Sequence, residues 1–312
     1  MTEREKYKYI FGPVPSRRLG KSLGVDIVPL KTCTQNCLYC QLGVNGVTTV
    51  ERKPYVDMAE VVAELKDKLR SDVEIDVITV SGSGEPTLNS QISELISEIK
   101  AISDIPVVVI TNGTLLSDQQ VRKDLAQADV VMPSLDAGDE ETFKRINCPH
   151  ITLTLEKLVE GLIKFRKEYS GKIWLEVFFC EGINTSDEQV EKIKAKVLQI
   201  DPDKIQINTA VRPAADTMAV AVSPQKLTII AEEFGSNAEV IASFSKPSKP
   251  DDENIDTETI ADMLKRRPCT MDGICLSLNI SESRATELVS QMLEAAIIET
   301  ENKAGKLFYK LK

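Results

Sequence analysis

The amino-acid sequence predicts an α/β protein: a partial parallel barrel of six strand–helix units, followed by a small C-terminal winged-helix domain. From about residue 22 to residue 235, apolar β-branched runs alternate with longer helical patterns. Several of these runs, such as residues 107–110, are apolar throughout, which is typical of parallel strands covered on both faces. Six units favour an incomplete barrel, because a barrel of eight units usually needs about 250 residues. After residue 255 the pattern changes to three short helices and a hairpin, the order of elements in a winged helix.

The barrel elements follow one another in order, and their helix starts are marked by particular residues. Asp57, Ser117 and Ser186 each stand three residues before a Glu or Gln, which is the spacing of a capping box. Ser223, followed by proline, marks a fourth helix start. We predict strands at residues 22–30, 75–82, 106–113, 129–136, 172–180 and 203–210.

A short polar stretch divides the chain into two domains. Residues 245–254 contain proline and follow neither a helical nor a strand period, so they are interpreted as a linker. The barrel then occupies residues 1–244, and the winged-helix domain residues 255–312. Within the second domain we predict helices at residues 257–267, 270–279 and 282–296, and two strands within residues 297–309.

Composition and charge exclude several classes of protein. The chain has 312 residues and a net charge of −10, which disfavours electrostatic docking on nucleic acid across the whole surface. No apolar run approaches the length of a membrane span, and the charged N-terminus lacks a signal sequence, so we expect a cytoplasmic protein with no membrane partner. Seven cysteines, an odd number, argue against a disulfide framework. His150 is the only histidine, which excludes His-rich metal sites.

Three cysteines form the most specific motif of the chain. Cys33, Cys37 and Cys40 follow the spacing C-x3-C-x2-C, with Tyr39 just before the third. Thiolates this close together can bind one cluster of soft metal ions. A [4Fe–4S] cluster held by three thiolates keeps one iron open for a non-protein ligand. The alternatives are a structural zinc site, which prefers four closed ligands, and packing of all three side chains in the core.

Polar residues recur where the predicted strands end, at the edge that carries the active site of parallel barrels. The second strand leads into a turn in which glycines let the backbone approach a ligand and a glutamate supplies a carboxylate for a cationic amino group. Repetition of polar residues on one rim favours a pocket over a series of unrelated loop caps. The turn residues are Gly82, Ser83, Gly84 and Glu85, and the later rim residues are Thr111, Asn112, Ser134, Asp136, Glu181, Thr209 and Arg212.

The cysteine motif with its preceding aromatic residue, the Gly-Glu-Pro turn and the six-unit barrel together resemble the radical S-adenosylmethionine (SAM) enzyme superfamily. The resemblance covers roughly residues 10–245. It implies that the three cysteines bind a [4Fe–4S] cluster and that the open iron chelates SAM. It further implies that Tyr39 lies near the adenine and that residues 82–85 hold the methionine amino group. Asn112, Ser134 and Asp136 are candidate SAM-binding residues, the last two suited to ribose hydroxyls or an amino-acid head group.

The N-terminal segment narrows the resemblance. Arg17 and Arg18 stand among prolines and glycines just before the first strand. They are interpreted either as binding an anionic substrate or as part of a lid that pairs with barrel acids. This segment, with the cysteine motif, resembles the stand-alone iron–sulfur oxidoreductases grouped with the tRNA wybutosine-synthesis enzymes. Residues 1–32 contain no cysteine for a second cluster, so we do not expect wybutosine-type condensation.

The remaining cysteines and the winged helix carry weaker signals. We expect Cys180 to be a buried small hydrophobe, with a radical-quenching thiol or a cluster ligand as the alternatives, and Cys148 to lie in a turn. Cys269 and Cys275 are expected in the core of the winged helix. The charged residues of the third helix are mostly acidic, with Arg284 against Glu282, Glu287 and Glu294. This disfavours DNA binding and leaves RNA, peptide docking, dimerisation or barrel capping.

Two functions of different classes follow from these residues. The first is a radical SAM enzyme, of unknown reaction subclass, that cleaves SAM to a 5′-deoxyadenosyl radical and abstracts hydrogen from an unidentified substrate: a tRNA, a peptide or a small anionic metabolite. Such an oxidoreductase is oxygen-sensitive and takes its electron from a reductant such as ferredoxin or flavodoxin. The alternative is an iron–sulfur and SAM-binding redox sensor that signals through the winged helix without turnover.

Overall fold

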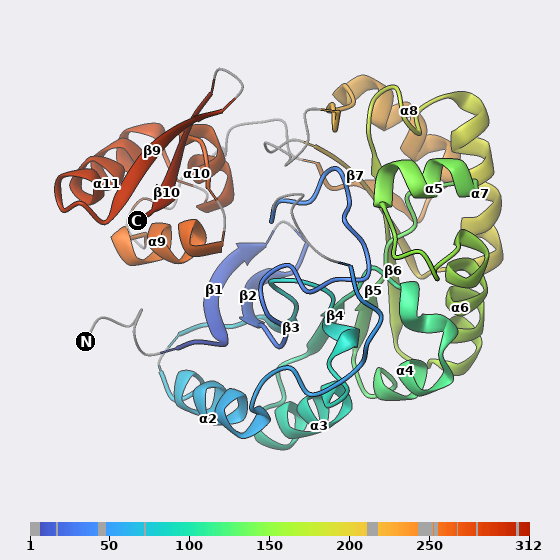
Figure 1. Ribbon diagram of the computed structural model, residues 1–312, viewed down its shortest axis with the longest axis horizontal. Helices are drawn as coiled ribbons and strands as arrows, with labels where there is room; N and C mark the ends of the chain where they lie inside the picture. The colour runs from blue at the N-terminus through green and yellow to red at the C-terminus, as the bar shows by residue number, and fades with distance from the viewer. Residues whose placement is uncertain are drawn as a thin grey trace.

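The structure is a computed structural model that describes residues 7–16, 18–42, 48–71, 73–210, 218–242, 252, 255–266, 268–278, 280–303 and 306–312. Its main feature is an eight-stranded sheet in which the strands β1 to β8 are neighbours in sequence order. β1 pairs with β2 in antiparallel orientation, and each later pair is parallel. The sheet curves, and the helices lie along its outer face (Figure 1).

At least one helix connects each parallel strand to the next, as expected for strands joined by right-handed crossovers. The strands of the large sheet are β1 (Ile10–Ser16), β2 (Gly20–Val25), β3 (Val77–Val80), β4 (Val107–Ile110), β5 (Val130–Met132), β6 (Lys172–Phe179), β7 (Lys204–Thr209) and β8 (Ala238–Val240). The helices are α2 (Met58–Lys68), α3 (Ile92–Ile102), α4 (Gln119–Asp124), α5 (Glu140–Asn147), α6 (Leu155–Glu168), α7 (Asp187–Ile200) and α8 (Pro224–Phe234), with 3₁₀ turns η1 (Pro86–Leu88) and η2 (Thr114–Ser117).

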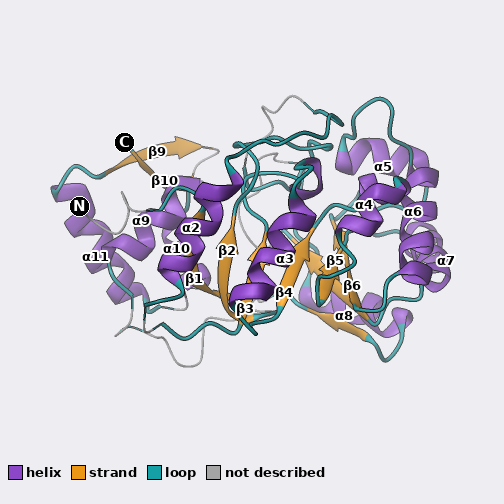
Figure 2. Ribbon diagram, turned by 90° about the horizontal axis from the view of Figure 1, so that it is seen from below, coloured by secondary structure: helices purple, strands orange, loops and turns teal. Residues whose placement is uncertain are grey.

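Most of the core lies between the sheet and the surrounding helices. β6 illustrates why, because its side chains alternate between two faces. Leu175 and Val177 are fully buried and belong to the main core. Trp174 packs instead in a small separate cluster with Leu19 and Val108, which lies on the concave face of the sheet. We call the space on this concave face the lumen; Figure 2 presents the strands from a second side.

The six predicted strands correspond to β2 through β7, and the structure corrects several details. The first strand ends at Val25 rather than at residue 30, and the chain turns at residues 29–32, where the backbone N–H of Thr32 donates to the carbonyl of Pro29 at 3.0 Å. The sequence patterns missed β1, β8 and α5. Asp57 and Ser186 cap their helices as predicted. Ser117 does not: Asp118 caps α4 by accepting a hydrogen bond from the backbone N–H of Gln120.

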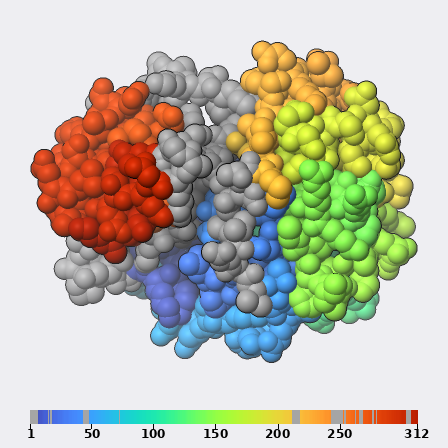
Figure 3. Space-filling model, turned by 45° about the horizontal axis from the view of Figure 1, so that its top comes forward, coloured from blue at the N-terminus to red at the C-terminus, as the bar shows by residue number. Residues whose placement is uncertain are grey.

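The C-terminal elements form a unit with its own hydrophobic core, visible as a lobe in the space-filling view (Figure 3). The unit contains three helices and a two-stranded antiparallel sheet. Cys269 forms an additional antiparallel bridge with Tyr309. The predicted linker, residues 245–254, lies outside the described residues apart from Asp252. The elements of this unit are α9 (Thr257–Arg266), α10 (Met271–Leu278), α11 (Glu282–Glu294), β9 (Ile298–Lys303) and β10 (Lys306–Leu311).

Within the part of the chain that the structure describes, no helix is both long enough and apolar enough to cross a membrane.

Candidate functional site

The loops after β2 and β3 interlock through their backbones. The backbone N–H of Lys31 donates to the carbonyl of Ser83 at 2.6 Å, and that of Glu85 donates to the carbonyl of Thr32 at 2.9 Å. A Cβ at Gly84 would stand 1.9 Å from the Thr32 carbonyl oxygen. Only glycine allows this approach. The glycine turn therefore fixes the position of the residue that directly precedes Cys33.

The cysteine loop is also held from the opposite side by the segment that follows α5. Backbone N–H groups of Asn36 and Leu38 donate to the carbonyls of Asn147 and Ile146, at 3.1 and 3.0 Å. In return, the backbone N–H of His150 donates to the carbonyl of Thr34 at 2.9 Å. This pairing resembles a short stretch of antiparallel sheet and gives the loop a defined shape before any metal binds.

The three cysteine side chains lie close enough to interact electrostatically. Burial, together with the nearby charge of Glu85, raises the pKa of the Cys33 thiol to about 12. Burial likewise raises the pKa of Cys37 well above its usual value, with added repulsion from Cys33 and Asp136. Burial disfavours the thiolate form, and a bound metal ion offsets this cost by compensating the negative charge. The donor set therefore fits a soft metal cluster.

Among the described residues, no three His, Cys, Asp or Glu side chains converge tightly enough to hold a single metal ion. A [4Fe–4S] cluster makes a different demand, because each thiolate binds a different iron atom. The spacing of Cys33, Cys37 and Cys40 along one loop is compatible with that demand.

Glu85 is buried, and its carboxylate joins the ends of β3 and β4. Oε1 accepts from the Thr87 and Thr111 hydroxyls, both at 2.6 Å, and Oε2 accepts from the backbone N–H of Asn112 at 2.7 Å. Burial raises the pKa of Glu85, while the hydrogen bonds from Thr111 and Thr87 oppose that rise. Glu85 thus organises the rim, a structural role that the sequence pattern did not indicate.

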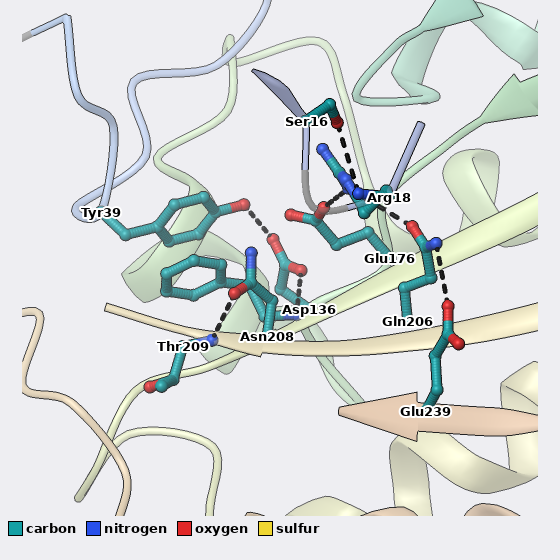
Figure 4. Close-up of polar contacts among 10 residues, drawn as sticks. Ser16, Arg18, Tyr39, Asp136, Glu176, Gln206, Asn208, Thr209 and Glu239 are labelled. Atoms are coloured by element: carbon teal, nitrogen blue, oxygen red, sulfur yellow. Dashed lines mark hydrogen bonds and ion pairs between the residues drawn. The ribbon is translucent and has the colours of Figure 1, made fainter. Parts of the chain in front are cut away.

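Asp136 is the centre of a polar network that reaches the cysteine loop (Figure 4). Its Oδ2 accepts hydrogen bonds from the hydroxyl of Tyr39 and, at 2.7 Å, from the side-chain amide of Asn147. Its Oδ1 accepts from the backbone N–H of Phe178 at 2.9 Å. The rings of Tyr39 and Phe178 are stacked, with centroids 3.9 Å apart. Burial raises the pKa of Asp136 to about 6 against the effect of these donors.

Asp26, at the end of β2, provides a further test of what the rim can bind. Its Oδ2 accepts from the hydroxyl of Ser83. Its Oδ1 is buried and has no hydrogen-bond partner among the described residues. Buried carboxylate oxygens are rarely left without a donor, so this atom calls for a ligand or a water. A positively charged amino group beside Gly82, where an added Cβ would stand 2.8 Å from this oxygen, would satisfy it.

A second polar cluster is built on the neighbouring strands β6 and β7 (Figure 4). Arg18 reaches in from the β1–β2 turn and forms an ion pair with Glu176 of β6. Its Nη1 also donates to Oε1 of Gln206 on β7 at 3.4 Å. The two ion-paired side chains are only 19% and 16% exposed. Arg18 thus pairs with a barrel acid, one of the two interpretations of the arginine pair; Arg17 lies outside the described residues.

The other predicted residues are distributed around this rim. Ser134 forms a parallel bridge with Glu176 through its backbone. Glu181 pairs with Lys226 at 2.8 Å, and the Thr209 hydroxyl donates to the carbonyl of Phe179 at 2.7 Å, so both serve neighbouring loops. Arg212 lies outside the described residues.

The remaining cysteines take separate positions. Cys180 is fully buried in the main core, as predicted, and burial raises its pKa to about 12. Cys148 ends α5 in the left-handed conformation, at φ 42°, and its Sγ donates to the carbonyl of Arg145 at 3.6 Å. Cys269 is buried in the C-terminal core, and Cys275 packs against it.

Comparison with known proteins identifies the superfamily. Residues 27–196, which contain the cysteine loop and most of the sheet, match the family model described as the radical SAM superfamily. This match covers more than half of the chain. The protein belongs to the radical SAM superfamily.

Other known proteins are similar to this chain in sequence or in fold. A UPF0026 protein of Methanocaldococcus jannaschii is 31% identical over 96% of this chain and 94% of its own length. A protein named GTPase Obg from Brachyspira hyodysenteriae is 42% identical over 97% of this chain, but the chain spans only 45% of that relative. A radical SAM methyltransferase from Sphaerobacter thermophilus shares the fold with a TM-score of 0.55 at 16% identity, over 72% of this chain and 67% of that one. The [FeFe]-hydrogenase maturase HydG gives a TM-score of 0.52 at 14% identity, over 75% and 54%.

Family membership establishes an enzyme of the radical SAM class whose cofactors are a [4Fe–4S] cluster and SAM. Sequence reasoning missed three residues of the site: Asp26, Asn147 and Phe178. Asp26 lies within a predicted strand, and Phe178 within an apolar run, so neither stood out. Asn147 follows no strand, and only its place before Cys148 and Pro149 marked it as part of a turn.

Proposed function

We propose that this protein cleaves SAM reductively at a cluster held by Cys33, Cys37 and Cys40, and abstracts hydrogen from a substrate bound in the lumen. When bound and reduced, the cluster supplies the electron that converts SAM to a 5′-deoxyadenosyl radical and methionine. The observation that carries the proposal is the interlocking of the cysteine loop with the turn at residues 82–85. That contact brings the residue before Cys33 against the glycine turn, which supports a shared site for the cluster and an amino group.

The protein's own residues position SAM and exclude water. Asp26 Oδ1, with the backbone of residues 82–85, receives the methionine ammonium, which gives the unpaired carboxylate oxygen its donor. Tyr39 and Phe178 offer an aromatic stack for the adenine, and Asn112, Ser134 and Asp136 supply polar groups nearby. Glu85 acts mainly by holding the ends of β3 and β4 in place.

The substrate occupies the lumen between this site and the Arg18–Glu176 pair. An ion pair so little exposed costs desolvation free energy, which supports a role in binding a polar substrate beyond any role in stability. A tRNA end, a peptide and a small anionic metabolite all present such groups. A low-potential protein such as ferredoxin or flavodoxin would deliver the electron.

We further infer that residues 255–312 form a winged helix. The support is the order α9, α10, α11, β9, β10, with the Cys269–Tyr309 bridge as a third strand position. The nearly balanced charge of this unit disfavours DNA and leaves RNA, a peptide or another part of the protein as the candidate partner.

The experiment is anaerobic reconstitution with iron and sulfide, followed by dithionite and SAM. We expect four iron atoms per chain, from the composition of the cluster, and formation of 5′-deoxyadenosine. Cys37→Ala should lose both the cluster and the product, whereas Cys148→Ala and Cys180→Ala serve as controls that keep the cluster. An intact cluster that forms no 5′-deoxyadenosine would refute the proposed SAM-cleaving activity. Zinc retained at one equivalent without iron would refute the cluster.

A redox sensor is the second candidate. The contact of α9 and α10 with β1 favours it, because β1 leads into the turn that carries Arg18 into the lumen. A sensor requires that the cluster state changes binding of a partner by the C-terminal unit without catalytic turnover. Multiple turnovers of SAM in the presence of a substrate would exclude this candidate.

A further inference from the structure

We infer that Asn147 is a positioning residue that raises the reduction potential of the cluster by donating a side-chain hydrogen bond to the sulfur of Cys37. The inference rests on the proposed function, in which Cys37 is a cluster ligand. Asn147 is the last residue of α5 and is only 2% exposed. Its Nδ2 lies 3.6 Å from the Sγ of Cys37.

The orientation of the amide follows from its other partner. Nδ2 lies 2.7 Å from Oδ2 of Asp136, and a carboxylate only accepts hydrogen bonds. A flipped amide would place its oxygen against this carboxylate. One N–H is therefore committed to Asp136, and the second is directed to the Cys37 sulfur and, at 3.5 Å, to the Tyr39 hydroxyl.

Asp136 is itself fixed, so it can hold the amide in this direction. Its carboxylate accepts from Tyr39 and from the Phe178 backbone. Its main-chain carbonyl accepts from Asn184 Nδ2 at 2.8 Å. Hydrogen bonds thus connect Asp136 to Asn147 and Asn147 to the sulfur of Cys37. Residues that bond to a metal ligand in this way tune the properties of the metal site.

The amide of Asn147 offsets negative charge near the cysteine sulfurs. The carboxylates of Glu85 and Asp136 lie close to the thiols of Cys33 and Cys37. Their negative charges disfavour the additional electron that reduction places on the cluster. An N–H donor directed at a ligand sulfur opposes this effect, because hydrogen bonds to the sulfurs stabilise the more negative state.

A second asparagine repeats the arrangement at another ligand. Nδ2 of Asn112 lies 3.5 Å from the Sγ of Cys33 and 2.7 Å from the hydroxyl of Thr34. Its Oδ1 accepts from the backbone and the hydroxyl of Thr114, which fixes the amide. Two amides from different strand–helix units thus each reach a different ligand sulfur.

Side-chain variants separate a purely structural role of Asn147 from its hydrogen bond to the Cys37 sulfur. Its main-chain carbonyl, which accepts from Asn36, survives a change of side chain. Asn147→Leu keeps the approximate volume and removes the donor, whereas Asn147→Gln keeps an amide. Asn208→Leu is the matched control, because Asn208 is an asparagine on β7 whose side chain accepts from the Thr209 backbone N–H rather than contacting a cysteine.

The test is a redox titration of the reconstituted holoprotein, followed by electron paramagnetic resonance. We expect the midpoint potential to shift to more negative values in Asn147→Leu, to return toward the wild-type value in Asn147→Gln, and to stay unchanged in Asn208→Leu. An unchanged potential in Asn147→Leu would overturn the inference. Failure of the wild-type protein to bind a cluster at all would instead refute the proposed function.

A second measurement keeps Asn147 and the three cysteines unchanged, and it tests the inference even if Asn147→Leu loses its cluster. The Asn112→Leu variant, labelled with asparagine that carries ¹⁵N only in its side-chain amide and then reduced, should give an electron spin-echo modulation from the Asn147 side-chain nitrogen near the cluster. Absence of that ¹⁵N coupling, with the cluster present, would overturn the inference as well.

Discussion

The backbone at Gly84 lies against Thr32 so closely that a Cβ at position 84 would stand 1.9 Å from the Thr32 carbonyl oxygen. The contact joins the loop after β3 to the loop that carries the cysteines. Because the obstructing atom belongs to the backbone, it cannot move aside as a flexible side chain would. The distance between the glycine turn and Cys33 is therefore set by the absence of a side chain at position 84.

We predict that Gly84→Ala destabilises the protein and reduces its cluster content. Overpacking of this kind typically costs about 1–3 kcal/mol, and the displaced residue directly precedes Cys33. Chemical denaturation of the apoprotein measures the first effect, and iron analysis after reconstitution the second. Gly273→Ala, within α10, is the control: the nearest atom to its Cβ would be the Thr270 hydroxyl at 3.3 Å, and alanine favours helix. Equal stability and iron content in Gly84→Ala and the wild type would contradict the prediction.

Asp26→Asn should weaken SAM binding to the holoprotein by about tenfold, since loss of one charge-assisted hydrogen bond is worth about 1.5 kcal/mol. The reason is the buried Oδ1 beside Gly82. Equilibrium dialysis with SAM measures the effect. A SAM analogue without the amino group provides the control and should bind the variant and the wild type equally. If both ligands lose affinity to the same extent, Asp26 supports the loop and does not receive the amino group.

Much of the repeating part of the fold is predictable from sequence, because strands such as β4 are apolar runs and most helices start at a residue that caps them. β1 was not predictable on these grounds: residues 10–16 contain two prolines and two polar or flexible residues, and only pairing with β2 makes them a strand. The cysteines were recognisable because their spacing is local. The contacts of Asp26 with Gly82, and of Asn147 with Cys37, join residues more than fifty positions apart, and no local pattern encodes them.

The capping residue Asp139 should make stability depend on pH. Its carboxylate accepts from the backbone N–H of Thr142 at 2.9 Å and from Gln189 and Lys192. These donors, the Thr142 N–H first, lower the pKa of Asp139 below its ordinary value of 3.8. A lowered pKa in the folded state contributes stability that is present above the unfolded value and is lost as the pH falls below it.

We therefore predict that the wild type is more stable than Asp139→Asn at pH 7 and that the difference shrinks below about pH 4. Urea denaturation across this range measures it. Asp187→Asn is a suitable control, because Asp187 lies exposed in the first turn of α7 and does not cap that helix. A difference between Asp139→Asn and the wild type that stays constant with pH would show that the charge of Asp139 does not contribute.

Variants of Arg18 and Glu176 show whether this ion pair stabilises the fold or also binds the substrate. Arg18→Met alone leaves Glu176 as a little-exposed carboxylate without its partner. Loss of a fully buried partner lowers the free energy of unfolding by about 3–5 kcal/mol. Because both side chains keep some exposure, we expect a loss at the lower end of that range or below it. The double variant Arg18→Met, Glu176→Leu should recover most of the loss, because it removes both charges. Denaturation of the wild type, Arg18→Met, Glu176→Leu and the double variant completes the cycle. Formation of 5′-deoxyadenosine without substrate should persist in the double variant, whereas deuterium transfer from a labelled substrate should fall. Substrate turnover that survives in a stable double variant would assign the pair to the fold alone.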